Sequence, residues 1–386
     1  MVVLVESSVV PFNRPSFEGD ELAHVATAVG GGVSSAKGPF SEQVSELFRD
    51  AIGSDDVLLT TSCTAALELA AMLMRFEPGD NVIVPSFTFV TTASAFAREG
   101  AELRFADIEP ARLGLDPDSV AAQIDERTRA VVVVHYAGVA ADLEGLERVL
   151  ADWPDVVLIE DNAHGLFGSQ NGRPLGSFGR FATLSFHETK NFICGEGGAL
   201  LLNDPADVEA AHVLYDKGTN RRQFFAGDVD KYSWIDRGSS FGLSDLLAAC
   251  LLGQLEQRDA ILAKRAAVFD AYAEALTASQ ERLGYRLPIV PDGCEQAYHM
   301  FYVVLSDAGR RDSILQTLRD QSIKATFHYV PLHDAEGAKP HTTRSFDCPV
   351  TDDISSRLIR LPFFNNITDD ELARVVESFL SAAERF

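Results

Sequence analysis

The sequence predicts an α/β fold, with a large domain on a mostly parallel sheet and a smaller α+β domain after it. Short apolar segments rich in β-branched residues alternate with amphipathic helical segments through the first two thirds of the 386-residue chain. This alternation is typical of parallel strands joined by helices. Residues 131–134 are four consecutive valines, a pattern that indicates a strand buried on both faces.

The elements of the large domain follow from this pattern in chain order. The segments predicted as strands are 57–60, 81–84, 103–105, 130–135, 156–160, 181–186 and 199–202. The segments predicted as intervening helices are 64–76, 88–99, 143–153 and 207–215. We therefore expect a sheet that is covered by helices on both faces.

The remainder of the chain predicts a second, smaller domain. Residues 243–276 form one long amphipathic pattern without proline, which predicts a single helix that connects the two domains. The elements expected after it are a strand at 298–305, a helix at 311–321, a strand at 324–329 and a terminal helix at 369–386. We place the large domain at residues 10–250 and the small domain at residues 251–386.

Composition limits the partners. The formal net charge of −24 disfavours nucleic acids and anionic membranes, because the field of the protein repels both. No apolar run reaches the roughly 18 residues that a membrane helix needs. Residues 1–6 lack the basic leader of an export signal, so we expect a cytoplasmic protein.

Lys190 is the first candidate for catalysis. It follows the predicted strand 181–186 within the segment 185–191 (SFHETKN) and precedes the glycine-rich segment 195–198. A lysine on such a loop forms a Schiff base if its surroundings lower its proton affinity. The chain has only seven lysines, so few others compete for this role. An ordinary surface lysine fits the same local sequence.

Asp161 is the second candidate, at the carboxyl end of the strand 156–160, where α/β sheets bind their ligands. A carboxylate there either protonates a heterocycle or holds a metal ion. It keeps the pyridine nitrogen of pyridoxal phosphate protonated while a lysine such as Lys190 holds the aldehyde. The metal alternative lacks further acids or histidines at ligand spacing, so no metal site is expected.

Residues 61–68 (TSCTAALE) lead from a predicted strand into a helix. Serine and threonine at this junction cap the helix, and its free backbone amides suit a phosphate. A cap without any ligand fits equally well. Phe89, after the next strand, offers a ring that stacks on a flat heterocycle, although an aromatic at a strand end is also common in a core.

Positive charge is concentrated in residues 217–237, which carry five basic residues against three acidic ones. Such a stretch either neutralises an anionic ligand or forms a solvated loop of mixed charge. The basic residues in it are Lys217, Arg221, Arg222, Lys231 and Arg237.

In the segments that contain these residues, the chain resembles the DegT/DnrJ/EryC1/StrS family of sugar aminotransferases, which are pyridoxal phosphate enzymes of fold type I. The resemblance covers nearly the whole chain and is most specific in residues 185–198. The other segments that carry it are 61–68, 85–92, 160–165, 217–221, 230–232 and 327–333. Within the family, residues 185–191 and the last three of these segments look closest to the dTDP-4-amino-4,6-dideoxygalactose transaminases.

The resemblance implies a role for each matching position. Lys190 would bind the cofactor aldehyde and move the proton, Asp161 would pair with the pyridinium nitrogen, and His164 would approach the ring hydroxyl. Phe89 would stack on the ring. The positions implied for the cofactor phosphate are Cys63, Thr64 and Ser185. The positions implied for the nucleotide sugar are Lys217, Asn220, Arg221, Lys231 and His328, with His333, His135 and Tyr136 as further candidates near the pocket.

The resemblance also implies a homodimer with active sites at the subunit interface. In many relatives an asparagine from the second subunit completes the phosphate site. Here Gly242 occupies the matching position, so the sequence does not show which residue makes this contact.

The function expected from the resemblance is transfer of an amino group from glutamate to C4 of a dTDP-4-keto-6-deoxyhexose. The product would be a dTDP-4-amino-4,6-dideoxyhexose of galacto or gluco configuration. Sugar 3-dehydratases of the family carry histidine in place of this lysine, so Lys190 favours transfer over dehydration. The alternative is a regulatory or sugar-nucleotide-binding protein that has the fold without catalysis.

Overall fold

The computed structural model describes residues 9–386, and the predicted absence of a leader at residues 1–6 lies outside the described residues. Within the described part of the chain, no helix is both long and apolar enough to cross a membrane.

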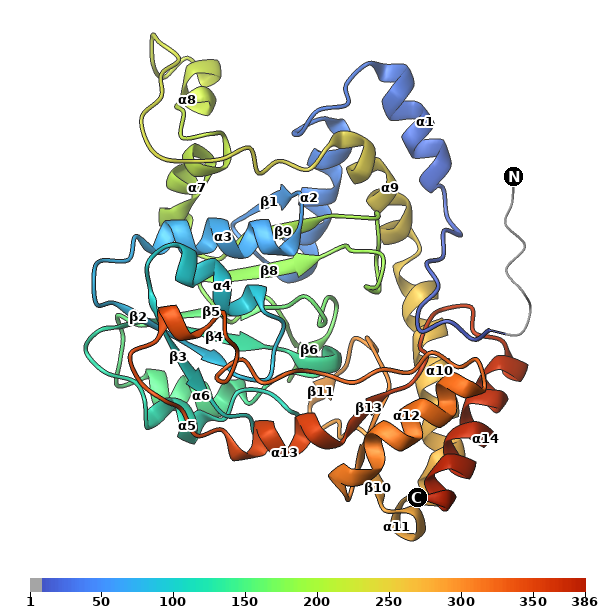
Figure 1. Cartoon of the computed structure of the whole chain (residues 1–386). Helices are drawn as coiled ribbons and strands as arrows, with labels where there is room; N and C mark the ends of the chain where they lie inside the picture. Colours follow the sequence, from blue (N-terminus) through green and yellow to red (C-terminus); the bar gives the residue numbers. More distant parts are fainter. Residues whose placement is uncertain (1–8) are drawn as a thin grey trace.

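A seven-stranded sheet forms the centre of the structure (Figure 1). Its order is β1-β9-β8-β5-β4-β2-β3, and the strands from β8 to β3 run parallel. β9 runs antiparallel to both of its neighbours, β1 and β8. The bounds are β1 Asp56–Thr60, β2 Asn81–Pro85, β3 Glu102–Ala106, β4 Thr128–Val134, β5 Val157–Asp161, β8 Phe181–Ser185 and β9 Gly198–Leu202. The predicted α/β class and mostly parallel sheet are confirmed.

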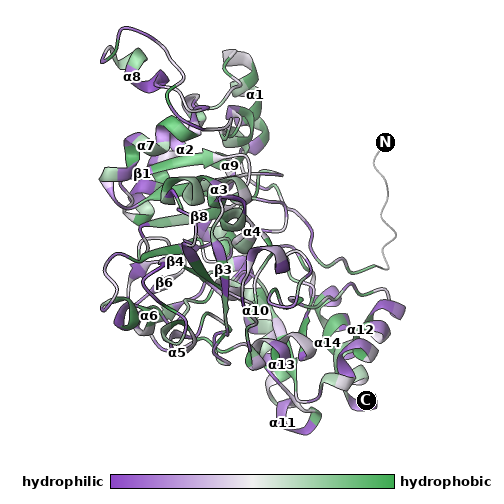
Figure 2. Cartoon of the chain, turned by 60° about the vertical axis from the view of Figure 1, so that its left-hand side comes forward, coloured by the Kyte–Doolittle hydropathy of each residue, from purple (hydrophilic) through white to green (hydrophobic). Residues whose placement is uncertain are grey.

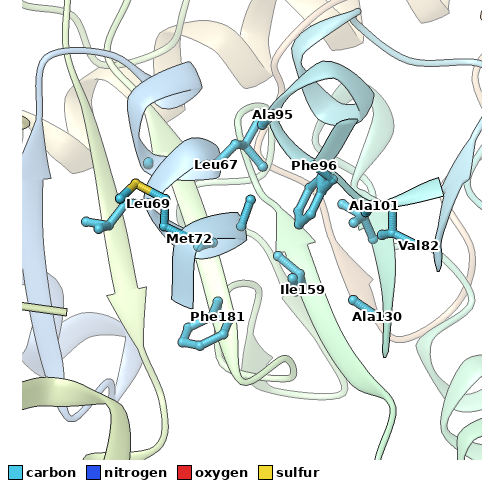
Figure 3. Close-up of a cluster of buried hydrophobic side chains, with 14 of the residues drawn as sticks. Leu67, Leu69, Met72, Val82, Ala95, Phe96, Ala101, Ala130, Ile159 and Phe181 are labelled. Carbon is cyan, nitrogen blue, oxygen red and sulfur yellow. The ribbon is translucent and has the colours of Figure 1, made fainter. Parts of the chain in front are cut away.

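Helices cover both faces of this sheet. One face packs against α3 (Cys63–Met74), α4 (Thr91–Arg98) and α7 (Val208–Tyr215) in an apolar core that includes Phe96, Ile159 and Phe181 (Figure 3). The helices of the opposite face are α2 (Pro39–Ile52), α5 (Pro117–Ala121), α6 (Leu143–Leu150) and α9 (Asp245–Glu256). α1 (Glu21–Gly31) packs on α9. Alternate residues of each strand enter the two cores, as the pleat requires.

A second apolar core belongs to the carboxyl-terminal part of the chain. It lies around a small antiparallel sheet of order β10-β12-β13. Val10 is buried in the same core. The bounds are β10 Tyr285–Arg286, β12 Tyr302–Leu305, β13 Leu358–Arg360, α10 Arg258–Thr277, α11 Gln280–Leu283, α12 Arg311–Asp320, α13 Pro349–Arg357 and α14 Asp369–Arg385. The division of the chain near residue 250 stays a prediction.

Short elements complete the chain. A small sheet joins β11 (Cys294–Glu295), β6 (Ser169–Gln170) and β7 (Arg173–Pro174). α8 (Arg221–Ala226) projects beyond α7 at the edge of the molecule (Figures 1 and 2). The remaining short helices are η1 Tyr136–Gly138, η2 Pro205–Asp207, η3 Ala308–Arg310 and η4 Lys339–His341.

Two predicted elements are wrong. The single helix expected at 243–276 is two helices, because Gln257 leaves the helical region with φ −98° and ψ 16°. α9 packs in the core of the large sheet, and the first turn of α10, with Ile261, continues in that core. The rest of α10, from Val268 onward, packs in the second core. Residues 324–329 form no strand; only Thr326 makes a bridge, to Arg360. This segment pairs with the edge strand β13 at that one position and does not continue along it.

Candidate active site

A cavity of about 310 Å³ lies beside the carboxyl ends of β4, β5 and β8. Residues from both parts of the chain line it, as expected for a ligand site at this edge of an α/β sheet. The lining residues are Phe12, Cys63, Thr88, Phe89, Thr91, Val134, Asp161, Ala163, His164, Ser185, His187, Thr189, Lys190, His299, His328, Tyr329 and Arg360.

The adjacent acids Glu160 and Asp161 have different environments, because successive side chains of a strand point to opposite faces. Glu160 is fully buried away from the cavity. It accepts hydrogen bonds from the backbone N–H groups of residues 176, 178 and 179 at 2.7–2.8 Å. His135 Nε2 lies 2.8 Å from the same carboxylate. Glu160 and His135 therefore belong to the scaffold, and the expectation that His135 reaches the pocket is wrong.

Asp161 lines the cavity and is almost fully buried. Its Oδ2 accepts a hydrogen bond of 2.7 Å from the Thr92 hydroxyl. Burial raises the pKa of Asp161, while the hydrogen bond from Thr92 and the charge of Lys190 act in the opposite direction. A carboxylate in this position lacks a full counter-charge, so it favours a cationic group in the cavity.

Lys190 lies on the loop after β8, in a turn closed by its own N–H, which donates to the His187 carbonyl at 2.8 Å. Burial lowers the pKa of Lys190 to about 8, although the nearby Cys63 and Asp161 act to raise it. A larger fraction of this amine is neutral near neutral pH than for an exposed lysine. It is therefore suited to attack an aldehyde.

The amino end of α3 reaches the same cavity. Ser62 caps the helix by accepting a hydrogen bond of 3.1 Å from the Ala65 N–H, so the expected cap is present. Cys63 lines the cavity, and Thr64 follows it on the first turn. Gly198 on β9 permits this approach, because a Cβ there would overlap the Cys63 backbone nitrogen. The free amides of this turn attract an anion.

His164 and Phe89 are two rings of the cavity lining. His164 stacks on His299 with ring centroids 4.2 Å apart, and its buried Nδ1 has no hydrogen-bond partner among residues 9–386. Phe89 has 57% of its surface exposed, so it is not a core residue. Both are available to a bound ring.

Comparison with known proteins gives the family. Residues 15–380 match the model of the DegT/DnrJ/EryC1/StrS aminotransferase family. The chain belongs to this family. It is 30% identical over 381 residues to the spore coat polysaccharide biosynthesis protein SpsC of Bacillus subtilis (strain 168), and the match covers 96% of both chains.

Solved structures of aminotransferases share the fold. The aminotransferase TlmJ from Streptoalloteichus hindustanus is similar with a TM-score of 0.90 and 27% identity, over 98% of this chain and 99% of TlmJ. The PLP form of Spr1654, a putative sugar aminotransferase from Streptococcus pneumoniae, has a TM-score of 0.88 and 24% identity, over 98% and 99% of the two chains. The fold of this chain is therefore that of pyridoxal phosphate-dependent aminotransferases.

Of the five residues expected to bind a nucleotide sugar, one lines the cavity and four do not. His328 lines the cavity, but Lys217, Asn220, Arg221 and Lys231 do not. Asn220 and Arg221 lie at the start of α8, and Lys217 and Lys231 lie in the segments before and after it. Figure 2 shows α8 projecting beyond α7. The side chain of Asn220 closes this loop: its Nδ2 donates to the Lys231 carbonyl, and its Oδ1 accepts from the Ser233 N–H.

Gly242 is required where it stands. A Cβ at this position would overlap the Ala36 Cβ and would lie 3.0 Å from the Tyr215 hydroxyl oxygen. An asparagine therefore does not fit at this position without movement of these neighbours.

His333 is not part of the cavity lining, contrary to its expected place. Its Nδ1 lies 2.6 Å from the Ser86 hydroxyl. Its Nε2 lies 3.8 Å from Asp334 Oδ2 and 3.6 Å from Asp352 Oδ1, so two exposed carboxylates stand beside the ring. Sequence spacing did not reveal this group, and none of its members lines the cavity.

The sequence pattern missed Arg360 and His299, which the fold brings to the cavity from the second core. His299 is held by Asn191, the neighbour of Lys190: Asn191 Nδ2 donates to the Ala297 carbonyl, so its Oδ1 accepts from His299 Nδ1 at 2.9 Å. Tyr329, which stacks on His328 with centroids 3.8 Å apart, lies within a segment that did carry the family resemblance. No local signal marks Arg360.

Proposed function

We propose that the protein is a pyridoxal phosphate-dependent aminotransferase that moves an amino group from glutamate to C4 of a dTDP-4-keto-6-deoxyhexose. The observation that carries this proposal is that Lys190 and Asp161 line one cavity with the amino end of α3. An amine, a buried carboxylate and an anion-binding helix end are the three groups that this cofactor requires.

The residues fit the cofactor. Asp161 would face the pyridinium nitrogen, whose positive charge offsets the cost of burying the carboxylate. His164 has a buried nitrogen, unpaired within the described chain, for the ring hydroxyl. Phe89 offers its exposed ring for stacking. Cys63, Thr64 and Ser185 would hold the phosphate, with the first turn of α3 supplying backbone amides.

When bound, pyridoxal phosphate supplies an electron sink for the carbon that gains or loses the amino group. Lys190 would hold the aldehyde and then, once released, carry the proton between donor carbon and cofactor carbon. Its pKa of about 8 suits both tasks, because the amine exchanges a proton near neutral pH. Asp161 would remain ionised beside the ring nitrogen, held in position by Thr92.

The basic stretch 217–237 supports a second part of the proposal, a homodimer with shared active sites. This stretch exposes apolar side chains next to its basic ones: Phe225 is 72% exposed and Trp234 is 82% exposed. Exposed apolar groups of this size favour burial against a partner. We infer that Lys217, Arg221 and Lys231 serve the nucleotide diphosphate in the cavity of the second subunit, and that Asn220 holds the loop that carries them.

The test is to supply purified enzyme with glutamate and several dTDP-4-keto-6-deoxyhexoses. We expect the amino sugar as the product by mass spectrometry, with its C4 configuration read by NMR. Lys190→Ala protein should lose both the visible absorbance of the bound cofactor and amino transfer. Retention of both would overturn the assignment of Lys190.

Two outcomes would replace the proposal. A keto-sugar that loses water without gaining nitrogen would indicate a dehydratase. Failure of glutamate to bleach the cofactor absorbance, with tight binding of the nucleotide sugar, would indicate a binding protein that has the fold without catalysis.

A further inference from the structure

Arg360 places a positive charge in the cavity without a compensating carboxylate. It stands at the end of β13, where its backbone N–H donates to the Thr326 carbonyl at 2.7 Å. Its guanidinium makes no ion pair within the described part of the chain. Nη1 donates to His328 Nε2 at 2.5 Å, and the buried Nε has no partner among residues 9–386.

A second buried arginine shows what a structural guanidinium looks like in this protein. Arg265 donates to three oxygens: the carbonyls of Tyr298 and His299 and Asn365 Oδ1, at 2.7–2.8 Å. The N–H groups of Arg265 therefore have acceptors within the protein itself. Arg360 instead has one acceptor, an imidazole nitrogen, and faces a cavity. A guanidinium has five N–H donors, so most of those of Arg360 are available to a ligand.

The imidazole of His328 is fixed by this contact. Arginine only donates, so His328 Nε2 is the acceptor and the ring proton is on Nδ1, which donates to the Tyr136 hydroxyl oxygen 3.2 Å away. Burial and the charge of Arg360 lower the pKa of His328 well below its usual range. Because the His328 ring is neutral, the positive charge of this pair lies on the Arg360 guanidinium.

The direction of this guanidinium is also restricted. The ring of Phe12 lies 4.6 Å from Cζ and covers one face. A carboxylate binds a guanidinium at its edge, where parallel N–H groups match the two carboxylate oxygens, and a ring stacked on one face leaves that edge accessible. Among residues 9–386, Asp161 is the only carboxylate in the lining, and it faces the cofactor nitrogen in the proposed function.

We propose that Arg360 binds a carboxylate of the amino donor. This inference rests on the proposed function and adds the donor-recognition residue to it. The cofactor phosphate has its own anion site at α3 and Ser185, on the large sheet. The nucleotide diphosphate has the basic stretch 217–237, which is exposed, whereas Arg360 lies inside the cavity. The donor must enter beside Lys190 and brings an anionic group with it.

The experiment compares Arg360→Gln and Arg360→Lys holoenzyme with wild type. Arg360→Gln removes the charge, and Arg360→Lys preserves it without the planar fork. We expect Arg360→Gln to raise the KM for glutamate about 10- to 100-fold, the range for a charge-assisted hydrogen bond. The KM for the keto-sugar should change by less than about threefold. Arg360→Lys should lie between the two proteins.

A binding measurement separates this inference from the proposed function. Glutarate, a dicarboxylate without an amine, should bind the wild-type holoenzyme in a calorimetric titration and bind Arg360→Gln about tenfold more weakly or worse. Glutaramide, its uncharged counterpart, should not distinguish the two proteins. Arg319→Gln, at an exposed arginine on α12, is the matched control and should behave as wild type.

The outcomes are distinct. An unchanged glutamate KM and glutarate affinity in Arg360→Gln would overturn the inference, and so would a loss confined to the keto-sugar. Wild-type enzyme that does not react with glutamate but binds glutarate through Arg360 would overturn the proposed function alone. Thermal melting of each variant shows whether it is folded. If Arg360→Gln does not fold, an Arg360→Lys protein with wild-type donor KM would overturn the inference.

Discussion

The hydroxyl of Thr92 donates a hydrogen bond of 2.7 Å to the buried carboxylate of Asp161. Because the Thr92 proton is directed at Asp161, the neighbouring Thr88 hydroxyl, 2.9 Å away, donates to Thr92 in turn. The start of α4 and the segment before it thus supply two threonines that stabilise the ionised form of the acid at the end of β5.

Thr92→Val should weaken cofactor binding. Without the hydroxyl, the pKa of Asp161 rises further, and less of the carboxylate is ionised to meet a pyridinium nitrogen. We expect the dissociation constant of pyridoxal phosphate to rise about tenfold, corresponding to the ~1.5 kcal/mol of a hydrogen bond to a charged group. A spectrophotometric titration measures it. Thr88→Val leaves the bond to Asp161 in place and should have a smaller effect; equal effects would contradict this account.

Asp161→Asn should stabilise the cofactor-free protein while it weakens the holoenzyme. The pKa of Asp161 is raised above its ordinary value of 3.8 by burial. As pH rises from 3.8 toward the raised pKa of the folded protein, the unfolded chain loses the Asp161 proton first. The wild-type protein therefore loses stability relative to the variant. Melting temperatures of the two cofactor-free proteins should converge in acid and separate at higher pH. A variant that melts lower than wild type at neutral pH would contradict the prediction.

The capture of pyridoxal phosphate by cofactor-free protein should accelerate with pH, with a midpoint near 8. The reacting species is the neutral amine, and the pKa of Lys190 is lowered to about 8 by burial. Stopped-flow absorbance at a series of pH values measures the rate. Lys190→Met should show no capture at any pH. A midpoint near the ordinary lysine value of 10.5 would show that the amine is not buried as described.

The lowered pKa of Lys190 also makes the stability of the cofactor-free protein depend on pH. Below about pH 8, Lys190 is charged in both states and the folded protein bears the cost of burying it. Between 8 and 10.5 the folded protein releases the proton first, so this cost is relieved as pH rises. Cofactor-free Lys190→Met should therefore melt higher than wild type near neutral pH, and the difference should shrink in alkali.

Glu160→Gln should reduce stability by about 3 kcal/mol, the usual cost of disrupting a buried, charge-assisted network. The amide nitrogen of glutamine would meet one of the three backbone N–H donors that now point at the carboxylate. Chemical denaturation measures the loss. Glu274→Gln, the same change at an exposed position of α10, is a control that should leave stability near wild type. A neutral effect of Glu160→Gln would show that the 176–179 turn does not depend on this acid.

Mixing two inactive variants tests the shared active site. If Lys190 of one subunit works with the basic stretch of the other, then a mixed dimer of Lys190→Ala and Arg221→Gln has one intact site. Random exchange of subunits should restore about a quarter of the wild-type activity. If both residues serve the cavity of their own chain, no activity returns. Size-exclusion chromatography with light scattering confirms the dimer, and co-purification of an untagged variant with an affinity-tagged one confirms that subunits exchange.

The sequence by itself determined the α/β class, the succession of strands and helices along the chain, and the positions of Lys190 and Asp161 at strand ends. These features depend on local periodicity and on the fact that parallel strands share a carboxyl edge. The helix cap at Ser62 is likewise a local pattern, and the structure contains it.

Tertiary structure alone decided which distant residues complete the cavity. Arg360 and His299 come from the second core, and no short-range pattern relates them to Lys190. The break at Gln257 also has no signal in the sequence pattern, since the apolar residues on either side of it, Leu255 and Ile261, pack in one core. Charge clustering in 217–237 was visible in the sequence, but its distance from the cavity of its own chain was not. Burial and long-range contacts determine these properties, and a linear pattern does not encode them.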